Sequence, residues 1–266
     1  MCRLLAVLSR TPATVAQVLG EDLAQQYIEL GSLHRDGWGT AWISEVGADL
    51  AVLRGQHAGA TDPNLRQALF RDSAFARIAH ERLAKFPPRT IRPGNVHPFV
   101  SDGMAFAHNG TLGNHNVLKW RLPIAQRSRL RGGTDSEIYF RMICNAVQRG
   151  AAVSVAVLEV ARTLRDRLPK SSLNALILTS TELIIVHASE HTPIPKNLLR
   201  RRLFVGDKLP REHDERYYLL RMRKTEESLS VASTGIDESG WTDVPHESVT
   251  TIALSDFSHH TTFLKD

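Results

Sequence analysis

The stretch Met1-Cys2-Arg3-Leu4-Leu5-Ala6-Val7-Leu8-Ser9 opens the chain with a cysteine directly after the initiator methionine. Every residue from Leu4 to Leu8 is apolar, and so short an unbroken apolar run is typical of a β-strand that is buried on both faces. We therefore predict such a strand over residues 2–9, with the cysteine at its start.

A cysteine at position 2 becomes the amino terminus once methionine aminopeptidase removes Met1, as this enzyme does before small residues. The thiol and a free α-amine then belong to one residue, and an amine with a pKa of about 8 is partly neutral at physiological pH. Nucleophile and base are combined in this way in enzymes with an amino-terminal threonine. The alternative is a cysteine that stands in a strand by chance, and other motifs must decide between the two.

The composition predicts a globular protein that is large enough to bury a core. The chain has 266 residues, of which 42% are hydrophobic and 23% charged, and the charged residues are spread along it. The formal net charge is +5, but the one tight basic run, Arg200–Arg202, is better interpreted as a solvated face than as a nucleic-acid patch. We expect no nucleic-acid partner.

No stretch approaches the roughly 18 apolar residues that a membrane span requires, and the first ten residues lack the apolar core of a secretory signal. A cytoplasmic protein without a membrane partner is the expectation. Two cysteines are too few for a disulfide framework or a cysteine zinc site, so we expect no metal and no cofactor. Cys144 falls in an apolar helical pattern and is predicted to be a small buried residue.

The periodicity predicts an α+β fold with antiparallel sheets in a single domain over residues 1–266, because strands are followed by two consecutive helices and then by strands again. Strands are predicted over residues 2–9, 38–43, 50–54, 76–83, 104–108, 173–178, 183–187, 217–223, 229–233 and 249–254. Helices are predicted over residues 14–30, 62–70, 134–147 and 151–168, the third opening with a capping box at Thr134–Glu137. Residues 200–215 are predicted to form a surface loop.

Two segments could assist a thiol nucleophile. The run Ala107–Thr111 ends a predicted strand in Asn109-Gly110, whose side-chain amide and backbone N–H could both donate to a tetrahedral oxyanion. The same dipeptide is also an ordinary tight turn. Arg82 lies in an apolar strand interrupted by charges and could clamp a carboxylate with two hydrogen bonds, or it could be an exposed arginine on an edge strand.

Two further segments could complete a site for an α-amino acid. Asp135, in the first turn of its predicted helix, could bind a substrate ammonium or could merely complement the helix dipole. The glycine-flanked loop His34–Gly39 places Gly37 and Trp38 where they could line a pocket, or could simply lead into the next strand.

Six short motifs in this order resemble the class II glutamine amidotransferases, which are N-terminal nucleophile hydrolases. They are Met-Cys-Arg-Leu-Leu, His-Arg-Asp-Gly-Trp-Gly, Ala-His-x-Arg-x-Ala, Asn-x-His-Pro-Phe, Phe-Ala-His-Asn-Gly and Thr-Asp-Ser-Glu. The resemblance is close over residues 1–145 and looser over the later strands. It implies a four-layer αββα sandwich of two antiparallel sheets, with the nucleophile at the start of a central strand.

The resemblance also implies roles for individual residues. Cys2 corresponds to the nucleophile, Asn109 and Gly110 to the oxyanion hole, Arg82 to the group that binds the substrate carboxylate and Asp135 to the one that binds the ammonium. By the same resemblance Gly37, Trp38 and His97 line the substrate site. The sequence departs from the family's Arg-x-Ala-Thr pattern at Lys85, where the family's threonine helps to bind the carboxylate. This predicts a second positive charge or a shifted strand there, and leaves open whether free glutamine is the substrate.

The expected activity is hydrolysis of the γ-amide of glutamine or of a γ-glutamyl compound through a Cys2 thioester. One alternative is a glutaminase that passes ammonia to an accepting subunit. Another is a stand-alone hydrolase of γ-glutamyl amides, similar to relatives in the ergothioneine pathway and in glutathione degradation. A non-catalytic glutamine sensor and a basic nucleic-acid-binding domain are the alternatives from other classes.

Overall fold

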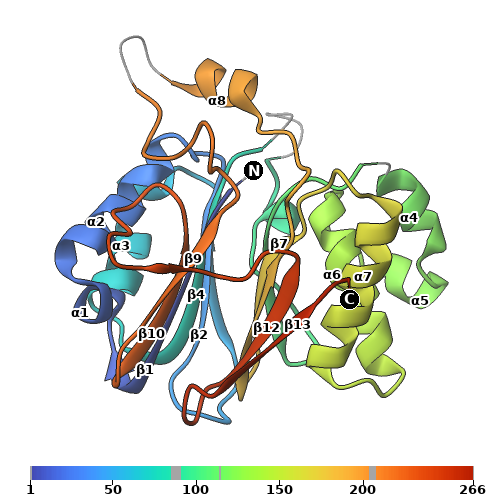
Figure 1. Cartoon of the computed structure of the whole chain (residues 1–266), viewed down its shortest axis with the longest axis horizontal. Coiled ribbons are helices and arrows are strands. Elements are labelled where there is room, and N and C mark those ends of the chain that lie inside the picture. The colour runs from blue at the N-terminus through green and yellow to red at the C-terminus, as the bar shows by residue number, and fades with distance from the viewer. Residues whose placement is uncertain (1, 85–90, 114, 204–207, 266) are drawn as a thin grey trace.

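The computed structural model describes residues 2–84, 91–113, 115–203 and 208–265. Two antiparallel β-sheets pack face to face, and helices cover the outer face of each sheet (Figure 1). This is the predicted four-layer αββα sandwich. Within the described ranges, no helix combines the length and the apolar character that crossing a bilayer requires.

The first sheet has the strand order β11-β9-β10-β1-β4-β2-β3. Its strands are β1 (Cys2–Ala13), β2 (Trp38–Ile43), β3 (Ala51–Gly55), β4 (Ala74–Arg82), β9 (Leu220–Lys224), β10 (Ser228–Ser233) and β11 (Thr242–Asp243). The second sheet has the order β13-β12-β8-β7-β6-β5. Its strands are β5 (Phe99–Ser101), β6 (Met104–Asn109), β7 (Asn174–Leu178), β8 (Glu182–His187), β12 (Ser248–Ala253) and β13 (His259–Phe263).

The helices form two groups, one on each side of the paired sheets. Those that cover the first sheet are α1 (Val15–Leu19), α2 (Glu21–Glu29) and α3 (Pro63–Phe70). Those on the side of the second sheet are α4 (His115–Arg121), α5 (Ile124–Arg127), α6 (Asp135–Gln148) and α7 (Val153–Arg167). A further short helix, α8 (Lys196–Arg202), lies beyond the end of the sandwich at which β1 begins (Figure 1).

Alternation along β1 divides its apolar side chains between two cores, as the unbroken apolar run predicts. Leu4 and Leu8 belong to the cluster between the two sheets, whereas Leu5 and Val7 belong to the cluster beneath α1–α3. Cys2 has the parity of Leu4 and therefore faces the second sheet. A strand buried on both faces explains why this segment contains no alternating polar residues.

Arg3 prevents the amino-terminal end of β1 from fraying. It is fully buried and donates from Nε to the carbonyl of Cys2 at 2.7 Å and from Nη1 to the carbonyl of Thr234 at 2.7 Å. Nη2 donates to the carbonyl of Tyr217 at 3.1 Å, and the guanidinium carbon lies 4.0 Å from the centre of the Tyr217 ring. A charged group with this many acceptors and an aromatic face can be buried without an isolated-charge penalty.

Several predicted elements need correction. The helix predicted over residues 14–30 is two helices, because Gly20 adopts φ 96°, a conformation that ends α1 and precedes α2. Part of the predicted loop 200–215 is helical, since Arg200–Arg202 form the last turn of α8. The strands β5, β11 and β13 and the helices α4 and α5 were not predicted; all are short, and periodicity is weakest over so few residues.

The capping box predicted at the start of α6 is only half formed. Thr134 Oγ1 accepts from the backbone N–H of Glu137 at 3.2 Å, as predicted. The Glu137 carboxylate, however, accepts from the backbone N–H groups of Arg131 and Gly132, at 2.6 and 2.9 Å, and so holds the preceding loop instead of the cap residue. The helix nevertheless begins at Asp135, where the pattern placed it.

Gly39 lets β2 approach the backbone of the segment that carries His97 closely. A Cβ at this position would lie 2.0 Å from the backbone carbonyl oxygen of His97. Gly39→Ala is therefore expected to lower the free energy of unfolding by about 1–3 kcal/mol, as overpacking does. Denaturant unfolding measures this, with Gly113→Ala as the control, because a Cβ at Gly113 meets nothing within 4 Å. Equal stability of the two variants would contradict the close approach.

Candidate active site

Cys2 lies at the junction of the two sheets, where its backbone is held from both sides. In the first sheet it pairs with Arg82 of β4. Toward the second sheet its backbone N–H donates to Asn109 Oδ1 at the end of β6, over 2.8 Å. The structure thus brings together three of the residues that the motifs singled out, from segments 80 and 107 positions distant in the chain.

The Asn109 side chain is oriented by its bond to Cys2. Because Oδ1 accepts from the Cys2 backbone, the amide nitrogen Nδ2 points the other way, and no group in the described part of the chain hydrogen-bonds it. Asn109 is completely buried, so an unused donor there costs about 1–3 kcal/mol. A buried donor held beside a thiol without a partner is suited to an oxyanion that exists only during a reaction.

Gly110 follows Asn109 at a place where a side chain does not fit. A Cβ would lie 2.1 Å from the Ser172 carbonyl oxygen and 2.5 Å from His108 Nε2. The neighbouring His108 ring is fixed by Ser136 Oγ at 2.9 Å and by the Ser172 carbonyl at 2.9 Å. The close packing against Ser172 and His108 requires glycine at this position.

Arg82 is a buried residue of a central strand, not the exposed edge arginine of the alternative interpretation. Burial lowers the pKa of its guanidinium, and the Cys2 thiol and the carboxylates of Asp36 and Asp135 act in the opposite direction. Nη1 donates to the Asp36 carbonyl at 3.2 Å. The guanidinium therefore lies among the thiol and two carboxylates, and a guanidinium can bind a further carboxylate with two hydrogen bonds.

Asp135 is half-buried at the start of α6 and reaches the loop that follows Gly110. Its Oδ2 accepts from the backbone N–H of Leu112 at 2.6 Å, and its Oδ1 from that of Ser136 at 3.0 Å. The carboxylate therefore joins α6 to the loop after the Asn109-Gly110 dipeptide, beyond any effect on the helix dipole.

Gly37 and Trp38 differ in their relation to the site. Gly37 has φ 125°, and its carbonyl accepts from the backbone N–H of Arg82 at 2.8 Å, so it supports the arginine. The side chain of Trp38 does not line the site, contrary to prediction. The pleat sends it to the helix-covered face, where Nε1 donates to Asp62 Oδ2 at 2.8 Å, and Gly39 takes the position facing the second sheet.

His97 lies on the thiol's side of the first sheet and packs against His80. His80 belongs to the Ala-His-x-Arg-x-Ala motif but was not predicted to be a site residue. The centre of the His97 ring lies 4.2 Å from that of His80 and 4.5 Å from that of Phe99, and the peptide bond from His97 to Pro98 is cis. Lys85, where the sequence departs from the family pattern, lies outside the described residues.

The two thiols have opposite electrostatic environments. Burial raises the pKa of the Cys2 thiol. The positive chain terminus and His80 lower it by more, so that the pKa falls to about 5. Burial raises the pKa of the Cys144 thiol to about 12. These opposite shifts favour the thiolate form at Cys2 and the thiol form at Cys144.

Asp36 and Arg202 form an ion pair that was not predicted and that joins α8 to the site. Arg202 Nη2 lies 2.7 Å from Asp36 Oδ2; the Asp36 side chain is buried and the Arg202 side chain is partly buried. Asp36 Oδ2 also accepts from the backbone N–H of Ala84 at 2.7 Å, just beyond β4. The pair therefore holds the chain just beyond Arg82. Two distant residues of opposite charge give no signal in the sequence.

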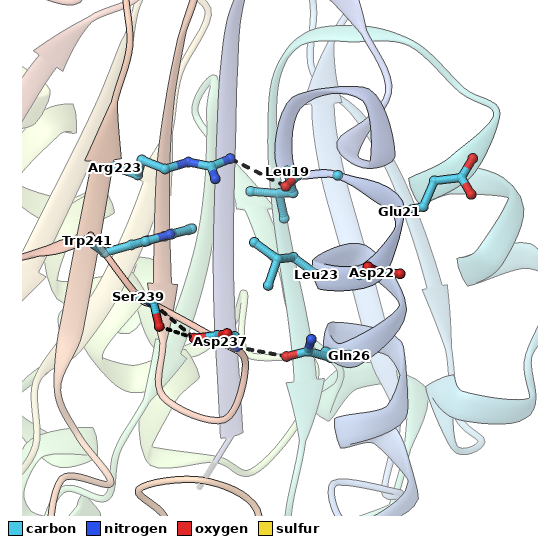
Figure 2. Close-up of a pocket in the computed structure, with 10 residues that line it drawn as sticks. Leu19, Glu21, Asp22, Leu23, Gln26, Arg223, Asp237, Ser239 and Trp241 are labelled. Atoms are coloured by element: carbon cyan, nitrogen blue, oxygen red, sulfur yellow. Dashed lines mark hydrogen bonds between the residues drawn. The ribbon is translucent and has the colours of Figure 1, made fainter.

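A surface groove of about 470 Å³ lies away from these residues, between α2 and the Trp241 segment (Figure 2). None of the predicted site residues lines it. Its polar groups bond to one another: Ser239 donates to Asp237 at 2.6 Å, and Arg223 donates to carbonyls at the end of α1. It has no unpaired buried group that points to a ligand among the residues described.

The fold and the placement of Cys2 at the head of a central strand define an N-terminal nucleophile hydrolase fold. The chain belongs to the family described as "Glutamine amidotransferases class-II", whose profile matches residues 1–251. The predicted family and fold are both confirmed.

Comparisons with individual proteins agree. Glutamine–fructose-6-phosphate aminotransferases (isomerizing) of Yersinia pseudotuberculosis and Yersinia pestis are each 29% identical over 156 residues, 57% of this chain but only 25% of theirs. A class-II glutamine aminotransferase domain protein of Silicibacter pomeroyi is similar over the whole of both chains, with TM-score 0.63 and 17% identity. Glutamine phosphoribosylpyrophosphate amidotransferase of B. subtilis has TM-score 0.66 and 19% identity, over 99% of this chain and 49% of that one.

Proposed function

We propose that this protein hydrolyses the γ-amide of glutamine or of a γ-glutamyl compound by way of a thioester on Cys2. The observation that carries the proposal is the Asn109 side chain, which holds the Cys2 backbone with its oxygen and presents an unused, buried donor from its nitrogen. No structural role explains why the donor has no partner, whereas an oxyanion hole requires one.

In the proposed reaction the Cys2 thiolate attacks the γ-carbonyl carbon. Asn109 Nδ2 and the Gly110 backbone N–H stabilise the oxyanion; in other enzymes the loss of one such donor costs roughly 10²–10³ in kcat. Collapse of the tetrahedral intermediate expels ammonia or an amine, and water then cleaves the γ-glutamyl thioester. The α-amine of Cys2, free after removal of Met1, is the general base of the site.

Arg82 and Asp135 select the substrate in this proposal. The buried guanidinium binds the α-carboxylate and the half-buried carboxylate binds the α-ammonium, so the γ-amide is the part of the substrate that reaches the thiol. Release of ammonia to an accepting subunit and stand-alone hydrolysis of a γ-glutamyl amide are the two alternatives within this activity. They share the chemistry at Cys2 and differ only in the leaving amine.

The test uses protein freed of Met1, incubated separately with glutamine and with γ-glutamyl peptides, with glutamate release as the readout. Release from either substrate supports the proposal, and the preferred one identifies the leaving group. A protein that binds these compounds in calorimetry but releases no glutamate from any would be a sensor and not a hydrolase. A diazo-ketone norleucine, followed by mass spectrometry of the intact protein, reports which cysteine reacts.

Asp135→Asn is expected to lower kcat/KM for γ-glutamyl substrates roughly 10- to 150-fold, because a charge-assisted hydrogen bond of about 1.5–3 kcal/mol is lost. Analogues without the α-amino group should be affected far less. The variant keeps an oxygen that can accept from Leu112, so the loop after Gly110 is retained. Equal losses for both substrate classes would show that Asp135 acts only on the helix and its loop.

A further inference from the structure

A cavity of about 420 Å³ lies at the β5 edge of the second sheet, between β5 and the loop that leads into α6. Its polar lining residues are Ser101, Ser128, Arg129, Arg131 and Arg141. Three of these five are arginines, and no acidic residue of the described ranges lines the cavity. None of the predicted catalytic or substrate-binding residues lines it either, so the cavity is separate from the candidate active site.

Arg141 is the buried arginine of this lining. It extends from α6 and is 6% exposed. Its Nη1 donates to Ser101 Oγ at 3.2 Å, but Nε has no hydrogen-bond partner among the residues described, and none of their carboxylates forms an ion pair with the guanidinium. Arginines are almost never fully buried unless they are paired. An anion in the cavity would supply the partner that Arg141 lacks.

Two exposed arginines, Arg129 and Arg131, line the cavity from the loop before α6. This loop is held by Glu137, whose carboxylate accepts from the backbone N–H groups of Arg131 and Gly132 at 2.6 and 2.9 Å. Arg131 also acts on Arg54 of β3: burial lowers the pKa of the Arg54 guanidinium, and the positive charge of Arg131 lowers it further. Such repulsion between positive charges indicates a local field that attracts an anion.

The Asp102 carboxylate, next to the lining residue Ser101, and the two lining hydroxyls are already hydrogen-bonded. Asp102 accepts from Ser101 Oγ at 2.7 Å and from Gln148 Nε2 at 2.9 Å. Ser128 Oγ donates to the carbonyl of Ala125 at 3.1 Å. The donors that remain for a ligand are therefore those of the arginines, whose guanidinium groups donate but cannot accept.

From this arrangement we propose that the cavity is a binding site for a phosphate group, either free or carried as a monoester on a small organic molecule. Three guanidiniums suit a phosphate dianion better than a carboxylate, which a single bidentate arginine satisfies. A volume of about 420 Å³ lies in the range of small-molecule sites and leaves room for an organic substituent. The proposal does not depend on the reaction proposed at Cys2.

The test is isothermal titration calorimetry of the full chain at about pH 8, where a phosphate group is mostly a dianion, with chloride holding the ionic strength constant. The ligands are inorganic phosphate, glycerol phosphate and AMP. We expect saturable binding of one phosphate group per chain. Arg141→Gln should weaken this binding about tenfold or more, because a charged donor to the anion is lost.

The double variant Arg129→Gln/Arg131→Gln should weaken binding similarly, and it decides alone if Arg141→Gln does not fold, since both of its sites are exposed. The matched control is Arg200→Gln/Arg201→Gln, which removes two adjacent exposed charges from α8 and should leave the affinity unchanged. An equal loss in this control would indicate general attraction to a basic protein and would overturn the proposal, as would the absence of binding by all three ligands. Tighter binding of an ester than of inorganic phosphate would support a site that also contacts the organic group, and equal binding would support a site for the phosphate alone.

Discussion

Cys2→Ala is expected to abolish glutamate release, whereas Cys144→Ala should keep kcat within a few fold of the parent. Both cysteines are buried, at 4% and 0% exposed, so accessibility does not explain the expected difference. Their surroundings do: the Cys2 thiol has a pKa of about 5 and lies beside Asn109, while that of Cys144 is raised to about 12 within the core beneath α6 and α7. Only the first supplies a thiolate at neutral pH.

Steady-state kinetics of both variants on the best γ-glutamyl substrate measure this difference. Cys144→Ala also serves as the control for general damage, because it removes a fully buried sulfur and is expected to cost stability without touching the site. Comparable loss of activity in the two variants would contradict the assignment of Cys2.

The fold was predictable because its decisive segments are long or unbroken. The apolar run at β1 and the 3.6-residue periodicity of α6 and α7 each specify burial that the structure confirms. The shorter elements were not predictable, since β5 has three residues, β11 has two and α5 has four. The single helix predicted across Gly20 was wrong because the apolar positions continue through the break and only the backbone angle changes.

The site was partly predictable for a different reason. Four site residues were predictable from their residue type and their neighbours: Cys2, Arg82, Asn109 and Asp135. Asn109 precedes a glycine, and Asp135 follows the helix cap Thr134. The error at Trp38 and the omission of His80 have one cause, strand parity. A count of alternate residues back from Arg82 along β4 puts His80 on the reactive face, and the same count in β2 turns Trp38 away.

The Asp36–Arg202 pair and the anchoring of β1 by Arg3 depend on contacts across more than 160 positions. No local pattern predicts them. These contacts fix the end of the sandwich that holds Cys2. Chain termini are usually poorly ordered unless such contacts hold them, and here charged residues from several segments supply the contacts.

Protein that retains Met1, or that carries an extension before it, is expected to lose about 10²–10⁴-fold in kcat/KM, the usual contribution of a general base. In such a chain the nitrogen of Cys2 is a peptide nitrogen, which has no basic lone pair, although it still donates to Asn109.

Removal of the preceding residues should restore activity, with a kcat/KM profile that rises through an apparent pKa near that of an α-amine, about 8. Full hydrolase activity in a protein that mass spectrometry shows to carry Met1 would contradict the amine's role.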